Sequence, residues 1–218
     1  MHNEELLYEE GGKQGIKIGQ KLSSIILIME LTKNLEGEIW ECGVYQGQIS
    51  RWLGFMTSVK PKTVRLFDTF EGRAEKTAPD TGTSDFRFLE TSLERVKKIV
   101  PWDFVEFHKG LIPNTFVGLE GCRVAFAYLD LDLYQPTVDS LNFILPRLVK
   151  GGVILLDDFE TEEWPGISKA VVDVLHPEKF EPLRNNLLGA GEELEQGEVL
   201  EHLYMIRKLE NDTNISKV

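Results

Sequence analysis

Residues 124–137 read VAFAYLDLDLYQPT. The apolar run 124–130 predicts a buried strand, and residues 137–148 predict a helix soon after it. A continuous apolar strand is typical of a parallel sheet that is covered on both faces, yet Asp130 and Asp132 stand at the end of this one. Because side chains alternate along a strand, the two carboxylates would share a face if the chain stayed extended.

The same order of strand and helix recurs along the chain. Parallel strands need right-handed crossovers that cover both faces, so this alternation predicts an α/β fold with a doubly wound, mostly parallel sheet. The predicted strands are 38–44, 63–68, 104–109, 124–130 and 152–158, and the predicted helices are 17–34, 48–57, 88–100, 137–148 and 167–175.

The C-terminal part has a different pattern. Two strand-like runs, 180–187 and 201–209, are joined by a segment rich in Gly and Glu, which predicts an antiparallel hairpin that closes the sheet. We read the acidic stretch 191–201 as a solvated loop. For the whole chain we expect a flexible N-terminal arm (1–16), a single domain (17–210) and a disordered tail (211–218).

Composition narrows the class of protein. The chain has 218 residues and a formal net charge of −12, which repels nucleic acid and anionic membrane surfaces. No apolar run reaches the ~18 residues that a membrane span needs, and the N-terminus lacks the order of a secretion signal, so we expect a cytoplasmic protein without a membrane partner. Cys42 and Cys122 are expected to be free thiols.

A glycine turn and a strand-end acid indicate a ligand site. The first strand runs into Gly43 and Gly47, and Asp68 ends the second strand. Ligands of open α/β sheets bind at the carboxyl ends of the strands, so this pair favours a nucleoside ligand. The GxGxxG spacing is absent, which makes a nicotinamide cofactor the second choice. Both features also have a structural reading, a tight turn and a cap, and that reading stays open.

Four carboxylates end two further strands. Asp130 and Asp132 follow one strand, Asp157 and Asp158 follow another, and all four converge on one edge of the predicted sheet. Carboxylates in a partly dry cleft repel one another, and a hard cation such as Mg²⁺ relieves this repulsion. At least one of them is expected to cap a helix instead. His108, at the same edge, is given a structural or adenine-side role before a catalytic one.

Five segments carry a resemblance to a known family. ECGVYQGQIS (41–50), LFDTFEG (66–72), FHKGLIPNTF (107–116), YLDLDLYQPT (128–137) and GGVILLDDFE (151–160) resemble class I S-adenosylmethionine-dependent methyltransferases. Within that class the chain is similar to the macrocin O-methyltransferase family of sugar-modifying enzymes, and the similarity spans roughly residues 38–175. Two departures are Leu131, where the family usually has Gly, and the segment 72–88, which is shorter than the family's loop.

The resemblance implies a Rossmann-like fold and a set of site residues. The cofactor S-adenosylmethionine is expected to contact Glu41, Gly43, Tyr45, Gly47, Ser50, Asp68, Lys109 and Asp130, with Asp68 on the ribose hydroxyls. The implied ligands of Mg²⁺ or a similar divalent cation are Asp130, Asp157 and Asp158, and the implied general base is Asp132.

The implied activity is Mg²⁺-dependent O-methylation of a hydroxyl on a sugar or glycosylated small molecule. Two alternatives stay open: a metal-independent methyltransferase acting on another nucleophile, and a non-catalytic nucleoside-binding module on the same fold. The oligomeric state is also open, because the amphipathic N-terminal helix suits either a homodimer interface or the core of a monomer.

Overall fold

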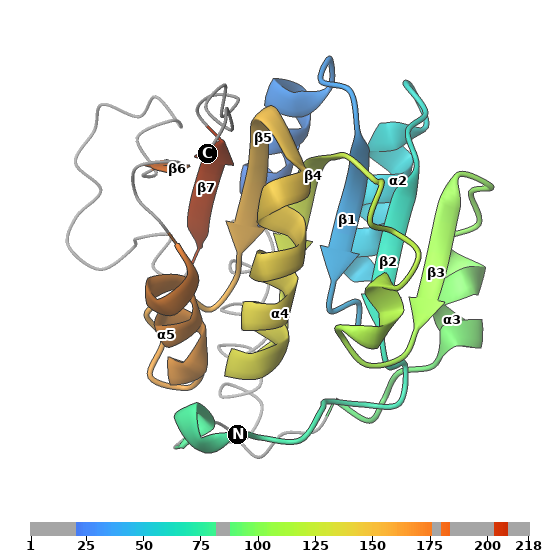
Figure 1. The fold of residues 1–218 in the computed structure, drawn as a ribbon. Coiled ribbons are helices and arrows are strands. Elements are labelled where there is room, and N and C mark those ends of the chain that lie inside the picture. Colours follow the sequence, from blue (N-terminus) through green and yellow to red (C-terminus); the bar gives the residue numbers. More distant parts are fainter. Residues whose placement is uncertain (1–20, 82–87, 176–179, 184–202, 209–218) are drawn as a thin grey trace, which may run out of the picture.

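The computed structural model describes residues 21–81, 88–175, 180–183 and 203–208 (Figure 1). They form a seven-stranded sheet with helices on both faces, which confirms the predicted α/β class. The strands are β1 Glu38–Cys42, β2 Val64–Asp68, β3 Val105–Lys109, β4 Val124–Leu129, β5 Leu148–Leu156, β6 Phe180–Leu183 and β7 Tyr204–Lys208. The helices are 21–32, α2 Gln48–Thr57, α3 Leu93–Ile99, α4 Tyr134–Ile144 and α5 Pro165–Val174, with short 3₁₀ turns at Ala78–Asp80, Asn114–Phe116 and Leu145–Arg147. The predicted arm 1–16, the acidic stretch 191–201 and the tail 211–218 lie outside the described residues.

The strand order is β3-β2-β1-β4-β5-β7-β6. Strands β1 to β5 are parallel, whereas β7 is antiparallel to both β5 and β6. The predicted antiparallel pairing of the last two strands is confirmed, and the later strand of the pair is the one next to β5. The order reverses between β1 and β4, so ligands are expected where the carboxyl ends of these two strands meet.

The core has two layers, one on each face of the sheet. Helices α4 and α5 cover one face, and the helix 21–32, α2 and α3 cover the other (Figure 1). All six residues of β4 are buried, which explains why its sequence is apolar throughout rather than alternating. Both cysteines are free thiols, as expected.

Element ends differ from the predictions for local reasons. The helix predicted at 88–100 begins at Leu93, because the Ser92 side chain accepts a hydrogen bond from the Arg95 N–H and caps it. The helix predicted from Thr137 begins three residues earlier, at Tyr134. Strand β5 ends at Leu156, so Asp157 and Asp158 belong to the loop that follows it.

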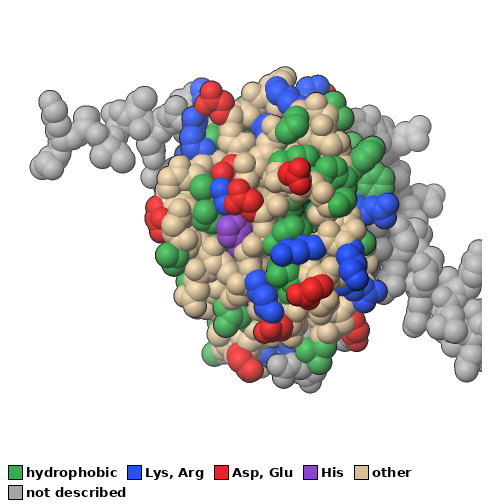
Figure 2. All heavy atoms as spheres, turned by 90° about the vertical axis from the view of Figure 1, so that its right-hand side faces the viewer, with side chains coloured by type: hydrophobic (Ala, Val, Ile, Leu, Met, Phe, Trp, Pro, Cys, Tyr) green, Lys and Arg blue, Asp and Glu red, His purple; other side chains and the backbone are tan. Residues whose placement is uncertain are grey.

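The surface seen in Figure 2 carries Lys and Arg side chains interspersed with Asp and Glu, without a broad basic patch on that face of the described residues. A nucleic-acid footprint would require clustered basic side chains, so this face gives no support to such a partner. Among the described residues, no helix is both long and apolar enough to cross a membrane.

Candidate functional site

A cavity of about 780 Å³ opens at the switch point of the sheet. Its wall brings together segments that lie far apart in the sequence: the β1–α2 loop, the ends of β2 and β4, and the loop after β5. From the predicted cofactor set the wall includes Glu41, Gly43, Tyr45, Asp68 and Asp130. The structure therefore collects most of the predicted cofactor residues around one space.

Gly43 lies where the β1–α2 loop meets the end of β4. Its φ is +90°, and a Cβ added there would lie 1.8 Å from the backbone oxygen of Asp130. Only glycine permits both this backbone conformation and this approach. Gly47 has a different task, since its added Cβ would lie 2.9 Å from Cγ1 of Val96 on α3. Gly43 thus shapes the cavity, and Gly47 allows α2 to pack against α3.

The carboxylate of Asp68 holds the glycine loop in place. Its Oδ2 accepts hydrogen bonds from the backbone N–H groups of Val44 (2.7 Å) and Tyr45 (2.9 Å). Its Oδ1 accepts a third from the N–H of Phe70 (2.7 Å). The Thr69 hydroxyl lies 3.4 Å from Oδ1, but its one proton is directed at the Gly72 oxygen, so of about four acceptor positions roughly one remains for a ligand hydroxyl. Asp68 therefore orders the loop as well as lining the cavity.

Glu41 is an acid buried under the same loop, with 1% of its surface exposed. The Ser50 hydroxyl donates a hydrogen bond of 2.6 Å to its Oε2. Burial raises the pKa of Glu41 well above its ordinary value, the charges of Asp130 and Asp68 raise it further, and the bond from Ser50 opposes the shift. Ser50 is fully buried on α2 and does not line the cavity, but it contacts Glu41, which does.

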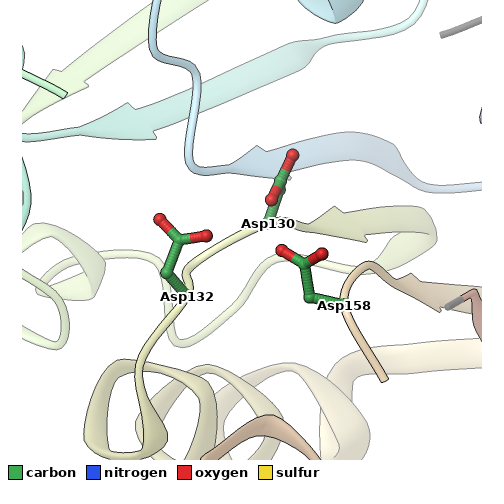
Figure 3. A group of neighbouring side chains, drawn as sticks. All are labelled: Asp130, Asp132 and Asp158. Carbon is green, nitrogen blue, oxygen red and sulfur yellow. The ribbon is translucent and has the colours of Figure 1, made fainter. Parts of the chain in front are cut away.

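Three carboxylates converge on the far side of the cavity (Figure 3). One oxygen each of Asp130, Asp132 and Asp158 lies within 4.8 Å of the others. The chain does not stay extended to Asp132: φ is +60° there, and the Leu133 N–H bonds to the Leu131 oxygen at 2.7 Å. Asp132 thus reaches Asp130 through a tight turn rather than through alternation along a strand.

Asp157 lies outside this group of three but next to Asp130, because both carboxylates accept the Tyr128 hydroxyl. It is 2% exposed, and its Oδ2 accepts a hydrogen bond of 2.6 Å from the Tyr128 hydroxyl. The same oxygen forms an ion pair with Lys21, whose Nζ also lies 3.8 Å from Oδ2 of Asp130. The cavity wall contains Lys21 and Asp158 but not Asp157.

The electrostatics of this cluster are those of crowded like charges. Burial raises the pKa of Asp130, Asp132 and Asp158, and their negative neighbours raise it further. Burial by itself would lower the pKa of Lys21, but the charges of Asp130 and Asp157 outweigh it and raise that pKa. A positive charge therefore stabilises the ionised form of this cluster, and the Lys21 ammonium is such a charge.

Residues 18–184 match the model of the Macrocin-O-methyltransferase (TylF) family. The chain belongs to this family. It is 30% identical over 144 residues to the 8-demethyl-8-(2,3-dimethoxy-alpha-L-rhamnosyl)-tetracenomycin-C 4'-O-methyltransferase of Streptomyces olivaceus, a match over 59% of this chain and 55% of that protein. It is 27% identical over 172 residues to the Mycinamicin III 3''-O-methyltransferase of Micromonospora griseorubida, over 66% of this chain and 67% of that protein. The chain thus matches little more than half the length of the first relative.

A solved structure shows the same fold. The calicheamicin methyltransferase CalS11 superposes with a TM-score of 0.71 at 21% identity, over 86% of this chain and 78% of that one. The fold is therefore a methyltransferase fold, as the resemblance implied. In this member of the macrocin O-methyltransferase family, the matched region contains both the glycine loop and the acidic cluster.

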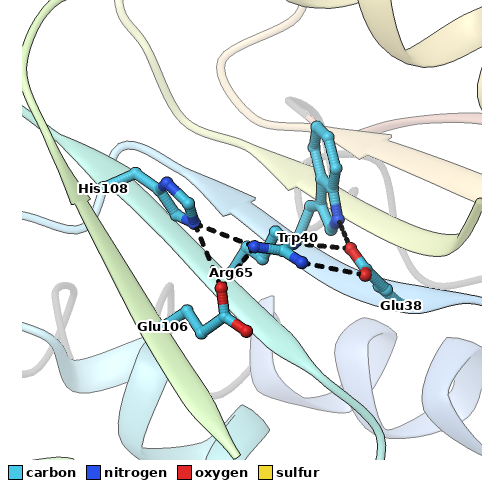
Figure 4. A network of polar contacts seen from close by, with 5 residues as sticks. All are labelled: Glu38, Trp40, Arg65, Glu106 and His108. Carbon is cyan, nitrogen blue, oxygen red and sulfur yellow. Dashed lines mark hydrogen bonds and ion pairs between the residues drawn. The ribbon is translucent and has the colours of Figure 1, made fainter. Parts of the chain in front are cut away.

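Lys109 lies outside the wall of the cavity. Its Nζ donates to Oε1 of Glu71 at 2.6 Å on the surface, and the wall at this point is formed by Gly110, Leu111 and Ile112. The preceding His108 belongs to a polar network across β1, β2 and β3 (Figure 4). Its ring stacks on Phe67, with the centroids 4.7 Å apart, and its Nε2 lies 3.2 Å from Nη1 of Arg65.

Arg65 is the centre of that network. It bonds to Glu38 through Nε at 2.7 Å and also pairs with Glu106, while Trp40 donates to Glu38 at 2.8 Å (Figure 4). Burial lowers the pKa of His108, and the charge of Arg65 lowers it further. These contacts give His108 a structural setting.

Two contributions to the site escape sequence reasoning. Lys21 lies in a helix that the sequence predicts, but no local motif connects it with Asp157, which is more than a hundred residues away. Arg73 and Trp164 also line the cavity, with the guanidinium 5.5 Å from the ring centroid, and Phe88 lies 6.1 Å from the same ring. In the sequence, this part of the wall is indicated only by the aromatic residues Phe88, at the start of a predicted helix, and Trp164, between two predicted elements.

The donor set fits a divalent cation. Oxygen atoms on opposite sides of an octahedral Mg²⁺ site lie about 4.2 Å apart, so carboxylates within 4.8 Å need only small movements to share one ion. The raised pKa values of the three acids supply the electrostatic reason for such an ion.

Proposed function

We propose that this protein is an S-adenosylmethionine-dependent O-methyltransferase that acts on a sugar hydroxyl of a glycosylated small molecule. The observation that carries the proposal is the continuous cavity of about 780 Å³ that joins the glycine loop to the acidic cluster. Family membership supports the methyl donor. The name of the first relative, which specifies a rhamnosyl-bearing compound, supports the acceptor class.

The cofactor would occupy the side of the cavity formed by the glycine loop. We assign its contacts to Glu41, Gly43, Tyr45, Asp68 and Asp130, with Asp68 facing the ribose hydroxyls. Gly47 and Ser50 would act without contacting the cofactor. Gly47 would let α2 pack closely against α3, and Ser50 would hold the Glu41 carboxylate in place. Lys109 would contribute only if its ion pair with Glu71 opened. The bound cofactor supplies the methyl group, and the chain positions it.

The acceptor hydroxyl would be activated at the acidic cluster. We assign cation binding to Asp130 and Asp158, which lie in the group of three, and to Asp157, whose Oδ2 becomes available when the Lys21 ammonium leaves it. We assign proton acceptance to Asp132. A divalent cation at this point would lower the pKa of the acceptor hydroxyl. Asp132 lies within the same 4.8 Å group as Asp130 and Asp158, which is where a proton acceptor for that hydroxyl is needed.

Two variants separate these roles. Asp157→Asn should weaken Mg²⁺ binding measured by titration calorimetry, whereas Asp132→Asn should lower turnover and leave Mg²⁺ affinity within a few fold of wild type. Turnover is measured as S-adenosylhomocysteine formed with a panel of rhamnosides, with and without chelator. An absence of S-adenosylmethionine binding would refute the proposal. Weakened Mg²⁺ binding in Asp132→Asn but not in Asp157→Asn would make Asp132 a ligand instead.

A metal-independent methyltransferase is the second candidate, and the ion pair of Lys21 with Asp157 favours it. A protein ammonium already neutralises part of the cluster, so the fold does not depend on a metal for this charge. Turnover that survives both chelator and Asp157→Asn would support this candidate. Binding of S-adenosylmethionine without turnover on any acceptor would point to a nucleoside-binding module.

A further inference from the structure

The Lys21 ammonium occupies the position of a cation in the acidic cluster. It reaches the site from the helix 21–32, pairs with Oδ2 of Asp157 and lies 3.8 Å from Oδ2 of Asp130. Its side chain is 30% exposed, and that of Asp157 is 2% exposed. The ion pair therefore lies at the boundary between the cavity and the core.

The acceptor atoms of Asp157 are already in use. Its Oδ2 receives both Lys21 and the Tyr128 hydroxyl, and its Oδ1 accepts the N–H of Asp158 at 2.9 Å. A divalent cation that binds Oδ2 of Asp157 must approach an oxygen that now faces an ammonium, and one that binds Oδ1 meets the same ammonium across a single carboxylate. Two positive centres repel strongly at such a distance, so they cannot both hold the same carboxylate oxygen.

We propose that Lys21 and a divalent cation are alternative counter-ions for the cluster of Asp130, Asp157 and Asp158. The inference rests on the proposed function, because it takes the cluster to be a cation site. Lys21 balances the charge of the metal-free protein, and a cation that binds displaces its ammonium from Asp157. Lys21 thus sets the cation concentration at which the site fills.

The exchange requires only a side-chain movement. Ile25 and Ile28 are fully buried and anchor the helix 21–32 to the core. The lysine stem is flexible and carries a strongly hydrated charge, so Nζ can move into solvent while the helix stays packed. The Tyr128 hydroxyl, 3.0 Å from Asp130 and 2.6 Å from Asp157, remains to orient both acids.

The test is cation affinity in the absence of cofactor and acceptor. Lys21→Met should bind Mn²⁺, measured as loss of the free-ion electron paramagnetic resonance signal, at least about tenfold more tightly than wild type. Lys21→Arg keeps the charge and should stay within about threefold of wild type. Lys33→Met, in the turn directly after the same helix and paired with Glu30, is the matched control and should not change the affinity.

Equal or weaker Mn²⁺ binding in Lys21→Met would overturn the inference, as would a gain of the same size in Lys33→Met. Circular dichroism and the midpoint of thermal unfolding show whether each variant is folded, and Lys21→Arg gives a second reading should Lys21→Met unfold. If neither wild type nor Lys21→Met binds Mn²⁺, the competition is refuted. Titration of the same samples with S-adenosylmethionine then still decides the methyltransferase proposal by itself.

Discussion

The carboxylate of Asp80 accepts a hydrogen bond of 2.8 Å from the backbone N–H of Tyr134, the first residue of α4. Its other oxygen accepts from both the N–H and the hydroxyl of Thr77, at 2.8 Å each. Asp80 is 1% exposed, so the acceptor side of these bonds is shielded from water. One buried acid thereby ties the segment that carries Arg73 to the start of the helix that follows Asp132.

Asp80→Ala should lower the free energy of unfolding by about 1–3 kcal/mol, because it removes the buried acceptor of three hydrogen bonds from Tyr134 and Thr77. Urea unfolding measures this. Asp139→Ala removes an acid on α4 whose hydrogen bond, among the residues that the structure describes, is to the exposed Gln135, and it should cost no more than about 0.5 kcal/mol. Equal costs for the two variants would show that Asp80 does not hold the segment.

Asp68→Asn should impair the cofactor side of the site. An amide offers a single acceptor oxygen in place of two, whereas Val44, Tyr45 and Phe70 all direct N–H groups at this side chain. We expect S-adenosylmethionine affinity to fall at least about tenfold, together with a loss of about 1–3 kcal/mol of stability. Calorimetric titration measures the affinity, with the exposed Asp103→Asn as the control. Unchanged affinity would limit Asp68 to a role in folding.

Ser50 and Thr57 are buried on the same helix and form a matched pair. Ser50→Ala removes the hydroxyl bonded to Glu41 and should cost about 1–3 kcal/mol of stability. The Thr57 hydroxyl has no hydrogen-bond partner among the described residues, so Thr57→Val should be neutral or stabilising. Thermal unfolding of the two variants compares them directly. A larger loss in Thr57→Val would contradict this reading of α2.

Glu41 should make stability depend on pH. Its pKa is raised in the folded state, so its contribution to stability is fully present below the unfolded value of about 4.3 and is lost as pH rises through the folded pKa. In chelator, the unfolding free energy of wild type should therefore fall more steeply above about pH 4.3 than that of Glu41→Gln. Urea titrations at a series of pH values measure both slopes. Parallel slopes would mean that folding leaves the pKa of Glu41 unchanged.

Much of the fold was readable because each signal is local. The apolar run of β4 has no alternation because helices cover both of its faces, and that pattern is visible in the sequence. The end of α4 was less readable: an apolar pattern does not show that the chain leaves the α-helix at Ile144 for a 3₁₀ turn at Leu145–Arg147. The position of β7 between β5 and β6 depends on pairing across the sheet, which no short window contains.

By itself, the sequence determined the class of fold, the edge of the sheet that carries the site, and the acids and glycines that gather there. Strand periodicity and the rule that parallel strands end at one edge are enough for this. Only the tertiary structure decided which partners each of those acids contacts. Asp132 joins Asp130 through a turn with positive φ, and Asp157 turns to Tyr128 and to Lys21 on a distant helix. Buried charges take whichever partner packing brings within reach, and that partner can lie anywhere in the chain.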